Sequence, residues 1–541
     1  MKIKSNYALA LSSAFLLWLA WPPIPYTTPL LLVALVPLFI AISRIMSEPG
    51  QKKGKWVFLT AGLTFLVWNT ACIYWVYNAI SAYNNPVVAL LVSLIPYGLG
   101  ALLMTFAFWL FYRLKLVTAS PKLAYFGLVS FWVSMEYLHA SWDLAFPWMT
   151  LGNGLAGMHQ LAQWYETTGV YGGSVWIILS NILAFEAWKS YQQNTGYLKI
   201  RTGLGWLLLV LIPVGISLAK YYNYQEKPMP VNVVVVQPNI DPYEKMGGMS
   251  TADQLDILTK LSDSVSQVNT EYFIWPETAL PSYVDEEKIR DSREFHSLQQ
   301  FLNRYKNGTL ITGMETMRFY NEQKTISSSL DPNSGRYYDH FNTAVQLENS
   351  PNVQFYHKSK LVPGVEKMPF PKLLSFLSPV FAGLGGTVSG WGWQDDPGVF
   401  YSQSGVGVSP VICYESLWGS WIGQSVKDGA QLIAIITNDG WWGNTSGKDQ
   451  HFLYAKLRAI ETRRWVVRSA NTGISGFIDQ RGDVVKQSGW WKRDALKMDV
   501  NLNDQLTFYT KSGDIIAQLL SLCGIGLALL IPLKAFSRKK A

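Results

Sequence analysis

Hydrophobic residues form long uninterrupted runs through the first part of the chain and once more near its end. Each run is close to the ~20 residues that cross the ~30 Å hydrocarbon core of a bilayer. The candidate membrane spans are 7–22, 27–44, 57–80, 87–112, 122–140, 170–189, 203–220 and 514–534. The first run is not a cleavable signal, because "WLAWPPIPYTTP" offers no small-residue cleavage site and another apolar run follows at once. The pattern predicts a polytopic α-helical membrane region.

Basic residues lie on alternate connections between these predicted spans. Lys2 and Lys4 precede the first span, and basic residues recur after the second, fourth and sixth spans and in the tail Arg538, Lys539 and Lys540. The intervening connections "PPIPYTTP" and "SAYNNP" contain neither residue type. Because short basic loops remain on the cytoplasmic side of a membrane, both termini are expected to be cytoplasmic and the segment 222–512 is expected to be external.

Between residues 222 and 512, short β-branched runs alternate with amphipathic polar stretches. The apolar runs predict strands, and the periodic stretches predict helices. The predicted strands are 231–240, 271–277, 308–315, 341–347, 405–415 and 430–440, and the predicted helices are 251–268 and 451–464. Buried strands covered by helices define an α/β domain. We therefore predict a seven-helix membrane region (1–221), an external α/β domain (222–512), and a final span with a short basic tail (513–541).

The composition agrees with a membrane protein and argues against other classes. Hydrophobic residues make up 49% of the 541 residues, charged residues make up 15%, and the formal net charge is +8. The basic residues form no dense tract, so no nucleic-acid partner is expected. The His residues do not cluster with a zinc-like spacing, and His451 is interpreted as a residue near a helix cap. Without a GxGxxG or P-loop motif, neither a metal nor a cofactor is predicted.

The stretch "SPVICYESLWGS" places Cys413 at the end of a β-branched run and before a predicted helix. The other cysteines, Cys72 and Cys523, lie in apolar runs, so no disulfide framework is indicated. A nucleophile at a strand-to-helix turn is exposed at the sheet edge, where backbone N–H groups stabilise an oxyanion. The start of a helix also favours the thiolate. By itself, Cys413 fits a buried structural cysteine at least as well.

Two charged residues also follow strand-like runs. Glu277 follows "FIWP", and a carboxylate at such a strand end can act as a base; its alternative role is a helix N-cap or a surface acid. Lys358 ends "FYHK", and a lysine there can hold an oxyanion; its alternative role is a solvated strand end.

Glu277, Lys358 and Cys413, in this order and each at a strand end, resemble the Glu–Lys–Cys triad of the nitrilase superfamily. The resemblance covers most of 230–505 and includes "VVQPNI", "WPET", "HKSKLVPGVE", "ICYES" and "NDGWWG". It implies a nitrilase-like αββα sandwich. It also implies that Glu277 is the general base, that Lys358 stabilises the tetrahedral intermediate, and that Cys413 is the nucleophile.

The position of the predicted α/β domain between two membrane spans points to one family within this superfamily. A nitrilase-like domain between a seventh and an eighth span is similar to the apolipoprotein N-acyltransferase family, and "SMEYLHASWDLAFPWMTLGN" resembles the Glu…Phe-Pro-Trp segment of that family. The resemblance implies that Glu366, Tyr414 and Glu415 orient the catalytic lysine and shape the pocket, and that Asn342 lies near the substrate. Two features depart from the family: "LVPGVE" stands where Leu-Val-Pro-Phe-Gly-Glu is common, and Met246 stands where Trp is common.

Members of this family move an acyl chain from a phospholipid, through a cysteine thioester, to the amino group of an N-terminal S-diacylglyceryl-cysteine of a lipoprotein. The resemblance therefore implies a ping-pong acyltransferase with a phospholipid donor such as phosphatidylethanolamine, apolipoprotein acceptors and no cofactor. It also implies a multi-pass protein of the bacterial inner membrane whose catalytic domain is periplasmic. A site closed to water would favour the amine over water as acceptor.

The segment 370–393, "FPKLLSFLSPVFAGLGGTVSGWGW", is unusually apolar for an external loop. Its large apolar side chains suggest contact with lipid, and we predict a lid or arm over the site, with a buried connection as the alternative. Two further Trp residues in "NDGWWG" are interpreted as interfacial anchors or core residues. The lid or lipid-facing candidates are Phe370, Phe381, Trp391, Trp393, Trp441 and Trp442.

Three alternative functions stay open. A membrane-tethered nitrilase-like amidase or hydrolase would use the same triad with water as acceptor, and it would stay active without the arm and the spans. A non-enzymatic receptor on a degenerate scaffold need not keep all three triad residues. A transporter would need paired charges within the membrane, and Glu136 is the single obvious candidate.

Overall fold

The computed structural model describes residues 3–81, 85–194, 196–245, 248–374, 376 and 390–540. These residues form two compact units. The membrane unit contains Met1–Tyr77, Pro86–Asn223 and Asp514–Ala541, and the α/β unit contains Asn78–Asn85 and Tyr224–Gly513. Residues 78–85 therefore belong with the α/β unit, whereas the sequence analysis assigned them to the membrane region.

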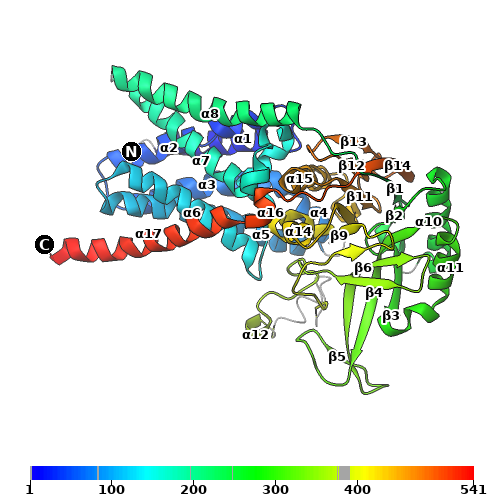
Figure 1. The fold of residues 1–541 in the computed structure, drawn as a ribbon. Helices are drawn as coiled ribbons and strands as arrows, with labels where there is room; N and C mark the ends of the chain where they lie inside the picture. Colours follow the sequence, from blue (N-terminus) through cyan, green and yellow to red (C-terminus); the bar gives the residue numbers. More distant parts are fainter. Residues whose placement is uncertain are drawn as a thin grey trace. The chain divides into compact units, whose positions relative to one another are not determined.

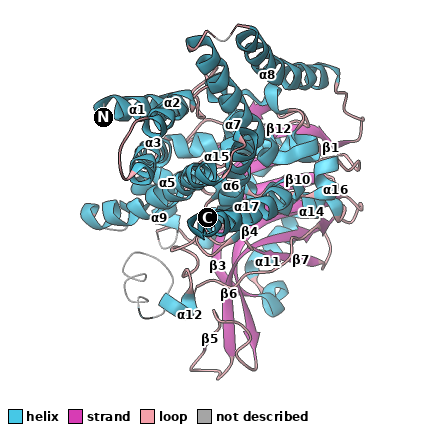
Figure 2. Cartoon of the chain, turned by 90° about the vertical axis from the view of Figure 1, so that its left-hand side faces the viewer, coloured by secondary structure: helices cyan, strands magenta, loops and turns pink. Residues whose placement is uncertain are grey.

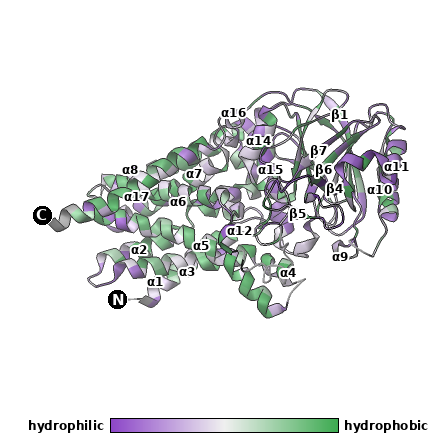
Figure 3. Ribbon diagram, turned by 90° about the horizontal axis from the view of Figure 1, so that it is seen from below, coloured by the Kyte–Doolittle hydropathy of each residue, from purple (hydrophilic) through white to green (hydrophobic). Residues whose placement is uncertain are grey.

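The membrane unit is helical in all of its long segments. Its helices are α1 (Ile3–Leu19), α2 (Val36–Ser47), α3 (Lys53–Ile73), α5 (Pro86–Val117), α6 (Pro121–Ser141), α7 (Tyr165–Gln192), α8 (Tyr197–Asn223) and α17 (Ile515–Lys540). A short helix, α4 (Trp75–Ser81), joins the two units in sequence, and 3₁₀ segments cover Thr28–Leu32, Pro147–Met149 and Leu151–Ala162. Figure 3 shows apolar residues over most of α5, α8 and α17.

Six helical segments among the described residues are long and apolar enough to cross a membrane. They are Thr28–Ser47, Lys53–Ile73, Pro86–Val117, Tyr165–Gln192, Tyr197–Asn223 and Ile515–Phe536. Leucines of α8 such as Leu204 and Leu211 are exposed on the protein surface, as expected for side chains that face lipid. Helices α1 and α6 occupy the other two predicted spans, and their crossing of a membrane stays a prediction.

The α/β unit contains two sheets (Figures 1 and 2). In the first sheet the order is β14-β1-β2-β4-β6-β5, with β3 beside β4 and β7 beside β6; in the second it is β13-β12-β11-β10-β9-β8. The first-sheet strands are β1 (Pro230–Gln237), β2 (Tyr272–Ile274), β3 (Leu280–Asp285), β4 (Thr309–Tyr320), β5 (Ser329–Leu330), β6 (Tyr337–Glu348), β7 (Val353–His357) and β14 (Asp494–Asn501). The second-sheet strands are β8 (Phe400–Tyr401), β9 (Gly407–Ile412), β10 (Leu432–Thr437), β11 (Val466–Ala470), β12 (Gly476–Ile478) and β13 (Val484–Gln487).

Helices cover the outer face of each sheet. The helices of the unit are α9 (Pro242–Lys245), α10 (Thr251–Val265), α11 (Arg293–Leu302), α12 (Pro371–Leu374), α14 (Gly419–Lys427), α15 (Ser446–Thr462) and α16 (Phe508–Ser512). One apolar cluster joins α10 and α11 to the first sheet, and another joins α14 and α15 to the second. Figure 3 colours much of α10 and α11 polar, which fits helices with one buried face.

The main core lies between the two sheets. Val233 and Val235 of β1 and Ile274 of β2 pack in one apolar cluster with Ile412 of β9 and Ile436 of β10. Because both faces of these strands are covered, their sequences are continuous apolar runs rather than alternating ones, as in "VNVVVVQ". The predicted αββα sandwich is confirmed. Each sheet also has three neighbouring parallel strands, and the carboxyl ends of parallel strands meet at one edge.

Candidate active site

The three candidate catalytic residues follow strands of the two sheets, and the structure brings them together. Glu277 follows β2, Lys358 follows β7 and Cys413 follows β9. Lys358 Nζ lies 3.2 Å from Glu277 Oε1, and the Cys413 thiol interacts electrostatically with both charged groups. All three side chains are buried. A base, a cation and a nucleophile in this proximity are the groups that nucleophilic attack on a carbonyl carbon requires.

Lys358 is an ammonium held between two carboxylates. Its Nζ donates to Glu366 Oε1 at 2.7 Å and to Glu277 Oε1 at 3.2 Å, and the residue is 1% exposed. Burial alone lowers the pKa of an ammonium, but the carboxylates of Glu277 and Glu366 outweigh burial and hold the Lys358 pKa well above its usual value. Lys358 is therefore charged at neutral pH, as an oxyanion partner must be.

Cys413 lies on a left-handed turn at the end of β9. Its φ of 52° is uncommon for a residue other than glycine, and a five-residue 3₁₀ segment, Cys413–Leu417, precedes α14. The short strand β8 pairs with β9 at Gly407 and Val408 and does not reach Pro410. Proline has no N–H group to donate, and β9 tolerates it here because β8 needs no hydrogen bond at this position. This sharp strand-to-helix turn is the geometry that presents a nucleophile at a sheet edge.

The expectation that the helix start favours the Cys413 thiolate is wrong. Burial, and then the Glu277 carboxylate, raise the pKa of the Cys413 thiol, although the Lys358 ammonium acts in the opposite direction. The turn after Cys413 is a short 3₁₀ segment rather than the first turn of a long helix, so it supplies little dipole. Cys413 is therefore a neutral thiol at rest, and its attack requires a base.

Asn342 and Glu366 complete the hydrogen-bonded group around Lys358. Asn342, on β6, donates through Nδ2 to Glu277 Oε1 at 2.7 Å and to Glu366 Oε1 at 3.4 Å. The backbone N–H of Lys358 donates to Asn342 O at 2.8 Å, and Glu366 Oε2 accepts from the Val362 N–H at 2.8 Å. These bonds fix the two carboxylates and the ammonium relative to one another.

Glu415 connects the turn after β7 to the turn after β9. Its Oε1 accepts from the Ser359 N–H at 2.6 Å and from Tyr356 Oη at 2.8 Å, and its Oε2 accepts from the Ile412 N–H at 2.8 Å. Burial raises the pKa of Glu415, although these donors act in the opposite direction. Glu415 therefore binds residues adjacent to the lysine and the cysteine, and its role in orienting Lys358 stays a prediction. Tyr414 is buried beside it and contacts Trp418 edge-on at 5.0 Å between ring centroids.

The predicted arm lies mostly outside the described residues, as do Phe381 and Met246. Of the other lipid-facing candidates, Trp393 is 42% exposed, and the rest are half-buried. The half-buried candidates are Phe370, Trp391, Trp441 and Trp442. A role of this segment as a lid stays a prediction.

Lys245 is a site residue that the sequence analysis missed. Its Nζ donates to the backbone oxygen of Glu277 and to Thr278 Oγ1, both at 3.0 Å, and it is 3% exposed. Burial lowers the pKa of Lys245 to about 8, although the carboxylates of Glu277 and Glu315 act in the opposite direction. A lysine in a short polar stretch gives no sequence signal of burial, so only the folded chain reveals it.

Gly313 of β4 packs directly against the backbone of Glu277. A Cβ atom at Gly313 would lie 2.4 Å from Thr278 N and 2.6 Å from Glu277 Cα, and the Gly313 N–H donates to Pro276 O at 3.1 Å. We expect Gly313→Ala to displace Glu277, to lower the free energy of unfolding by about 2 kcal/mol and to slow the catalysed reaction. Denaturant unfolding and activity measure both effects. Gly423→Ala in α14 is the control, because its Cβ would meet only one atom, at 3.8 Å; equal behaviour of the two variants would contradict the prediction.

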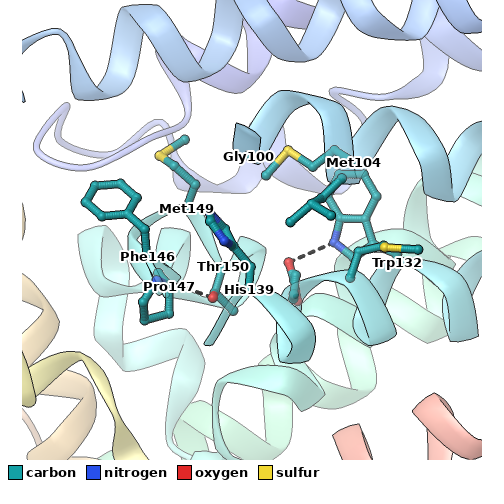
Figure 4. A pocket seen from close by; sticks show the side chains of 11 residues that line it. Gly100, Met104, Trp132, His139, Phe146, Pro147, Met149 and Thr150 are labelled. Atoms are coloured by element: carbon teal, nitrogen blue, oxygen red, sulfur yellow. Dashed lines mark hydrogen bonds between the residues drawn. The ribbon is translucent and has the colours of Figure 1, made fainter. Parts of the chain in front are cut away.

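The membrane unit has a separate pocket beside α6 (Figure 4). The Glu136 carboxylate lies in its wall, and Glu136 Oε1 accepts from Trp132 Nε1 at 2.8 Å and from the Leu151 N–H at 2.7 Å. Both donors are neutral, so these bonds indicate that Glu136 holds the segment after α6 in place. They give no support to a transporter. The pocket is lined by Gly100, Leu103, Met104, Trp132, Met135, Glu136, His139, Phe146, Pro147, Met149 and Thr150.

The described residues contain no group of three or more His, Cys, Asp and Glu side chains placed to hold a metal ion.

Sequence comparison agrees with this geometry. Residues 232–505 match the carbon-nitrogen hydrolase family, and residues 13–183 match the apolipoprotein N-acyltransferase N-terminal domain. Because the first match covers half of the chain, the chain belongs to the carbon-nitrogen hydrolase family. The amidase from Nesterenkonia sp. is one similar solved structure, with 15% sequence identity and a TM-score of 0.35 over 55% of this chain and 98% of the amidase.

Curated relatives extend the match to the membrane unit. The apolipoprotein N-acyltransferase of Chlorobaculum tepidum is 29% identical over 99% of this chain and 98% of that protein. The apolipoprotein N-acyltransferase of Geobacter metallireducens is 28% identical over 99% of this chain and 96% of that protein. The resemblance to apolipoprotein N-acyltransferases is therefore confirmed over nearly the whole chain, and the protein is a membrane acyltransferase.

Proposed function

We propose that this acyltransferase N-acylates the amino-terminal S-diacylglyceryl-cysteine of lipoproteins, with a phospholipid as donor and a thioester on Cys413 as intermediate. The observation that carries the proposal is the buried group of Glu277, Lys358 and Cys413 in a chain whose described residues include six membrane-length helical segments. The names of the relatives suggest the acceptor class. Phosphatidylethanolamine is the donor we would test first.

In the first half-reaction, the donor's ester carbonyl is attacked by Cys413. The thiol is neutral, so Glu277 removes its proton as the sulfur attacks. The Lys358 ammonium stabilises the negative charge that develops on the carbonyl oxygen. The intermediate then expels the alcohol of the lysophospholipid, which takes the proton from Glu277, and the acyl group stays on sulfur as a thioester.

In the second half-reaction, a neutral amine attacks the thioester carbon and gives one proton to Glu277. The C–S bond breaks, the thiolate regains that proton, and an amide is formed. Asn342 Oδ1 is buried and has no hydrogen-bond partner among the described residues, while Asn342 Nδ2 binds Glu277. An unsatisfied acceptor beside the base suits an N–H group of the incoming amine, since buried polar groups seek partners.

The topology follows from the charge pattern of the sequence. We propose an inner-membrane protein with cytoplasmic termini and a periplasmic α/β unit, because the basic connections all fall on one side of the predicted spans. Both proposed substrates carry acyl chains, so an enzyme with membrane-spanning helices meets them where they reside.

The test is a direct search for the acyl-enzyme. The purified full-length protein in detergent is incubated with phosphatidylethanolamine, quenched in acid and analysed by intact mass and peptide mapping. We expect an acyl-sized adduct on Cys413 that hydroxylamine removes and that Cys413→Ala lacks. Cys523→Ala is the matched control and keeps the adduct, because Cys523 is an exposed residue of α17.

A chase with a diacylglyceryl-cysteine peptide then separates the two acceptors. Loss of the adduct with formation of an N-acyl peptide supports the transferase. Release of free fatty acid at the same rate with and without peptide would favour the hydrolase alternative. No adduct on Cys413, with equal activity of parent and Cys413→Ala, would overturn the thioester mechanism.

A further inference from the structure

Behind the Cys413 turn lies a buried polar cluster that the proposed reaction does not use. It consists of Asp439 just after β10, His451 on α15 and Arg468 on β11, and each is 0% exposed. The interpretation of His451 as a residue near a helix cap is wrong, because α15 begins at Ser446 and the ring points into the interior of the unit. Buried charged groups at this depth are rare unless they are paired.

The cluster reaches the nucleophile through the carbonyl group of Cys413. His451 Nε2 lies 3.1 Å from Cys413 O and 2.8 Å from Ser416 Oγ. The Ser416 hydroxyl donates to the same carbonyl oxygen at 2.8 Å. A carbonyl oxygen only accepts hydrogen bonds, so Nε2–H is the donor in the contact with Cys413 O.

The other ring nitrogen is held by a charged pair. Asp439 Oδ1 lies 2.9 Å from His451 Nδ1, and Arg468 Nη2 lies 3.0 Å from the same nitrogen and 2.6 Å from Asp439 Oδ2. The Asp439–Arg468 ion pair therefore fixes the ring from its Nδ1 side. Burial and the Arg468 charge lower the pKa of His451, although the Asp439 carboxylate acts in the opposite direction.

The Cys413 turn needs such support because its backbone is strained. A left-handed conformation of a residue other than glycine costs about 1 kcal/mol or more, and Cys413 adopts φ 52°. Two donors on one carbonyl oxygen offset this cost and restrict rotation of the peptide unit that follows the thiol. An error of about 1 Å in the position of a nucleophile slows a reaction strongly.

We propose that His451 is a positioning residue that fixes Cys413 through a hydrogen bond from Nε2–H to the Cys413 carbonyl, with the opposite side of the ring held by Arg468 and Asp439. The inference rests on the proposed role of Cys413 as nucleophile. It predicts that the rate of Cys413 acylation depends on whether the side chain at position 451 can donate a hydrogen bond to the Cys413 carbonyl. The size of that buried side chain should matter less.

Two amide variants separate these possibilities. In His451→Gln the amide nitrogen reaches the place of Nε2, whereas in His451→Asn it is one methylene too short. The full-length variants in detergent are compared by thermal melting and by the rate of Cys413 acylation at saturating phosphatidylethanolamine. We expect His451→Gln to stay within about threefold of the parent and His451→Asn to be about tenfold slower, since a lost buried hydrogen bond has this effect. The donor concentration at half-maximal rate should not change.

Equal acylation rates in the two amide variants would overturn the proposal, as would rates that follow the melting temperatures alone. If His451→Asn does not fold, Ser416→Ala gives the decision, because it removes the other donor to the same carbonyl and keeps the ring. A slower rate at an unchanged melting temperature supports the proposal, and an unchanged rate overturns it. If the parent itself forms no acyl adduct, the proposed function fails independently of this inference. The rates of Cys413 alkylation by iodoacetamide, which needs no acyl donor, then compare the same variants in the same order.

Discussion

Glu277→Gln is expected to slow acylation of Cys413 by about a thousandfold, which lies within the range for loss of a general base. The thiol is neutral at rest, because burial and the Glu277 carboxylate raise its pKa, so attack without a base starts from an unreactive form. The fold should be retained, because the glutamine oxygen still accepts from Asn342 and Lys358 keeps its 2.7 Å bond to Glu366. Single-turnover acylation with phosphatidylethanolamine measures the effect.

The same variant should change the thiol in the opposite direction. Removal of the Glu277 charge removes one of the three causes that raise the Cys413 pKa. Alkylation by iodoacetamide should therefore be as fast as in the parent or faster, while acylation becomes much slower. Glu348→Gln is the matched control, because Glu348 is 2% exposed on β6 and bonds Gln346 instead of the triad. A parallel loss of alkylation and acylation in Glu277→Gln would show that Glu277 only positions the thiol.

Lys358→Met is expected to lower both stability and activity. Removal of one partner from a buried charged pair leaves the other charge uncompensated, which costs about 3 kcal/mol, and loss of an oxyanion partner slows acylation by at least about a hundredfold. Lys358 is 1% exposed and lies between two carboxylates. Denaturant unfolding and single-turnover acylation of the detergent-solubilised protein measure the two losses.

The stability lost in Lys358→Met should depend on pH, and the direction of that dependence can be derived. In the parent, the Lys358 pKa is raised, so its stabilisation is fully present below the ordinary lysine pKa of about 10.4 and is lost only as the pH rises through its higher folded value. In Lys358→Met, two adjacent carboxylates raise each other's pKa, so the variant loses stability as the pH rises above about 4.3. The deficit should therefore be larger at about pH 7 than at about pH 5.

Lys360→Met is the control for this variant. Lys360 lies two residues away, and its ammonium sits 3.9 Å from the centre of the Trp421 ring instead of between carboxylates. Its loss should cost about 1 kcal/mol without a fall in acylation. The prediction would be contradicted if Lys358→Met lost no more stability than Lys360→Met, or if its loss of stability did not change with pH. Either result would mean that Lys358 is not held as a buried charge between Glu277 and Glu366.

Local patterns were sufficient for the elements that carry the site. Each predicted strand overlaps an observed strand, and the predicted helices 251–268 and 451–464 correspond to α10 and α15. Buried strands and lipid-facing helices have strong one-dimensional signals, because both bury or expose long apolar runs. The prediction missed β3, β5, β8 and β11 to β14, because these strands are short or only partly buried, and such runs have little periodicity.

The sequence could not predict the charge state of the Cys413 thiol or the buried residues that hold the site, Lys245 and His451. The sequence favours a thiolate at a helix start, but burial and Glu277 reverse that expectation. Lys245 lies 32 residues from Glu277 and His451 lies 38 residues from Cys413. Hydrogen bonds between such distant segments depend on how strands and helices pack in the folded unit, which no local pattern records.

The sequence by itself determined the kinds of element, the apolar spans, and the identity and order of Glu277, Lys358 and Cys413, because each depends on residue type and short-range spacing. The tertiary structure alone decided that these residues share one buried hydrogen-bonded group, that the thiol is neutral, and that a buried histidine contacts the carbonyl group of Cys413. The physical reason is that burial and charge–charge interaction depend on distance in space, and both are set only when the strand ends of the sandwich are brought together.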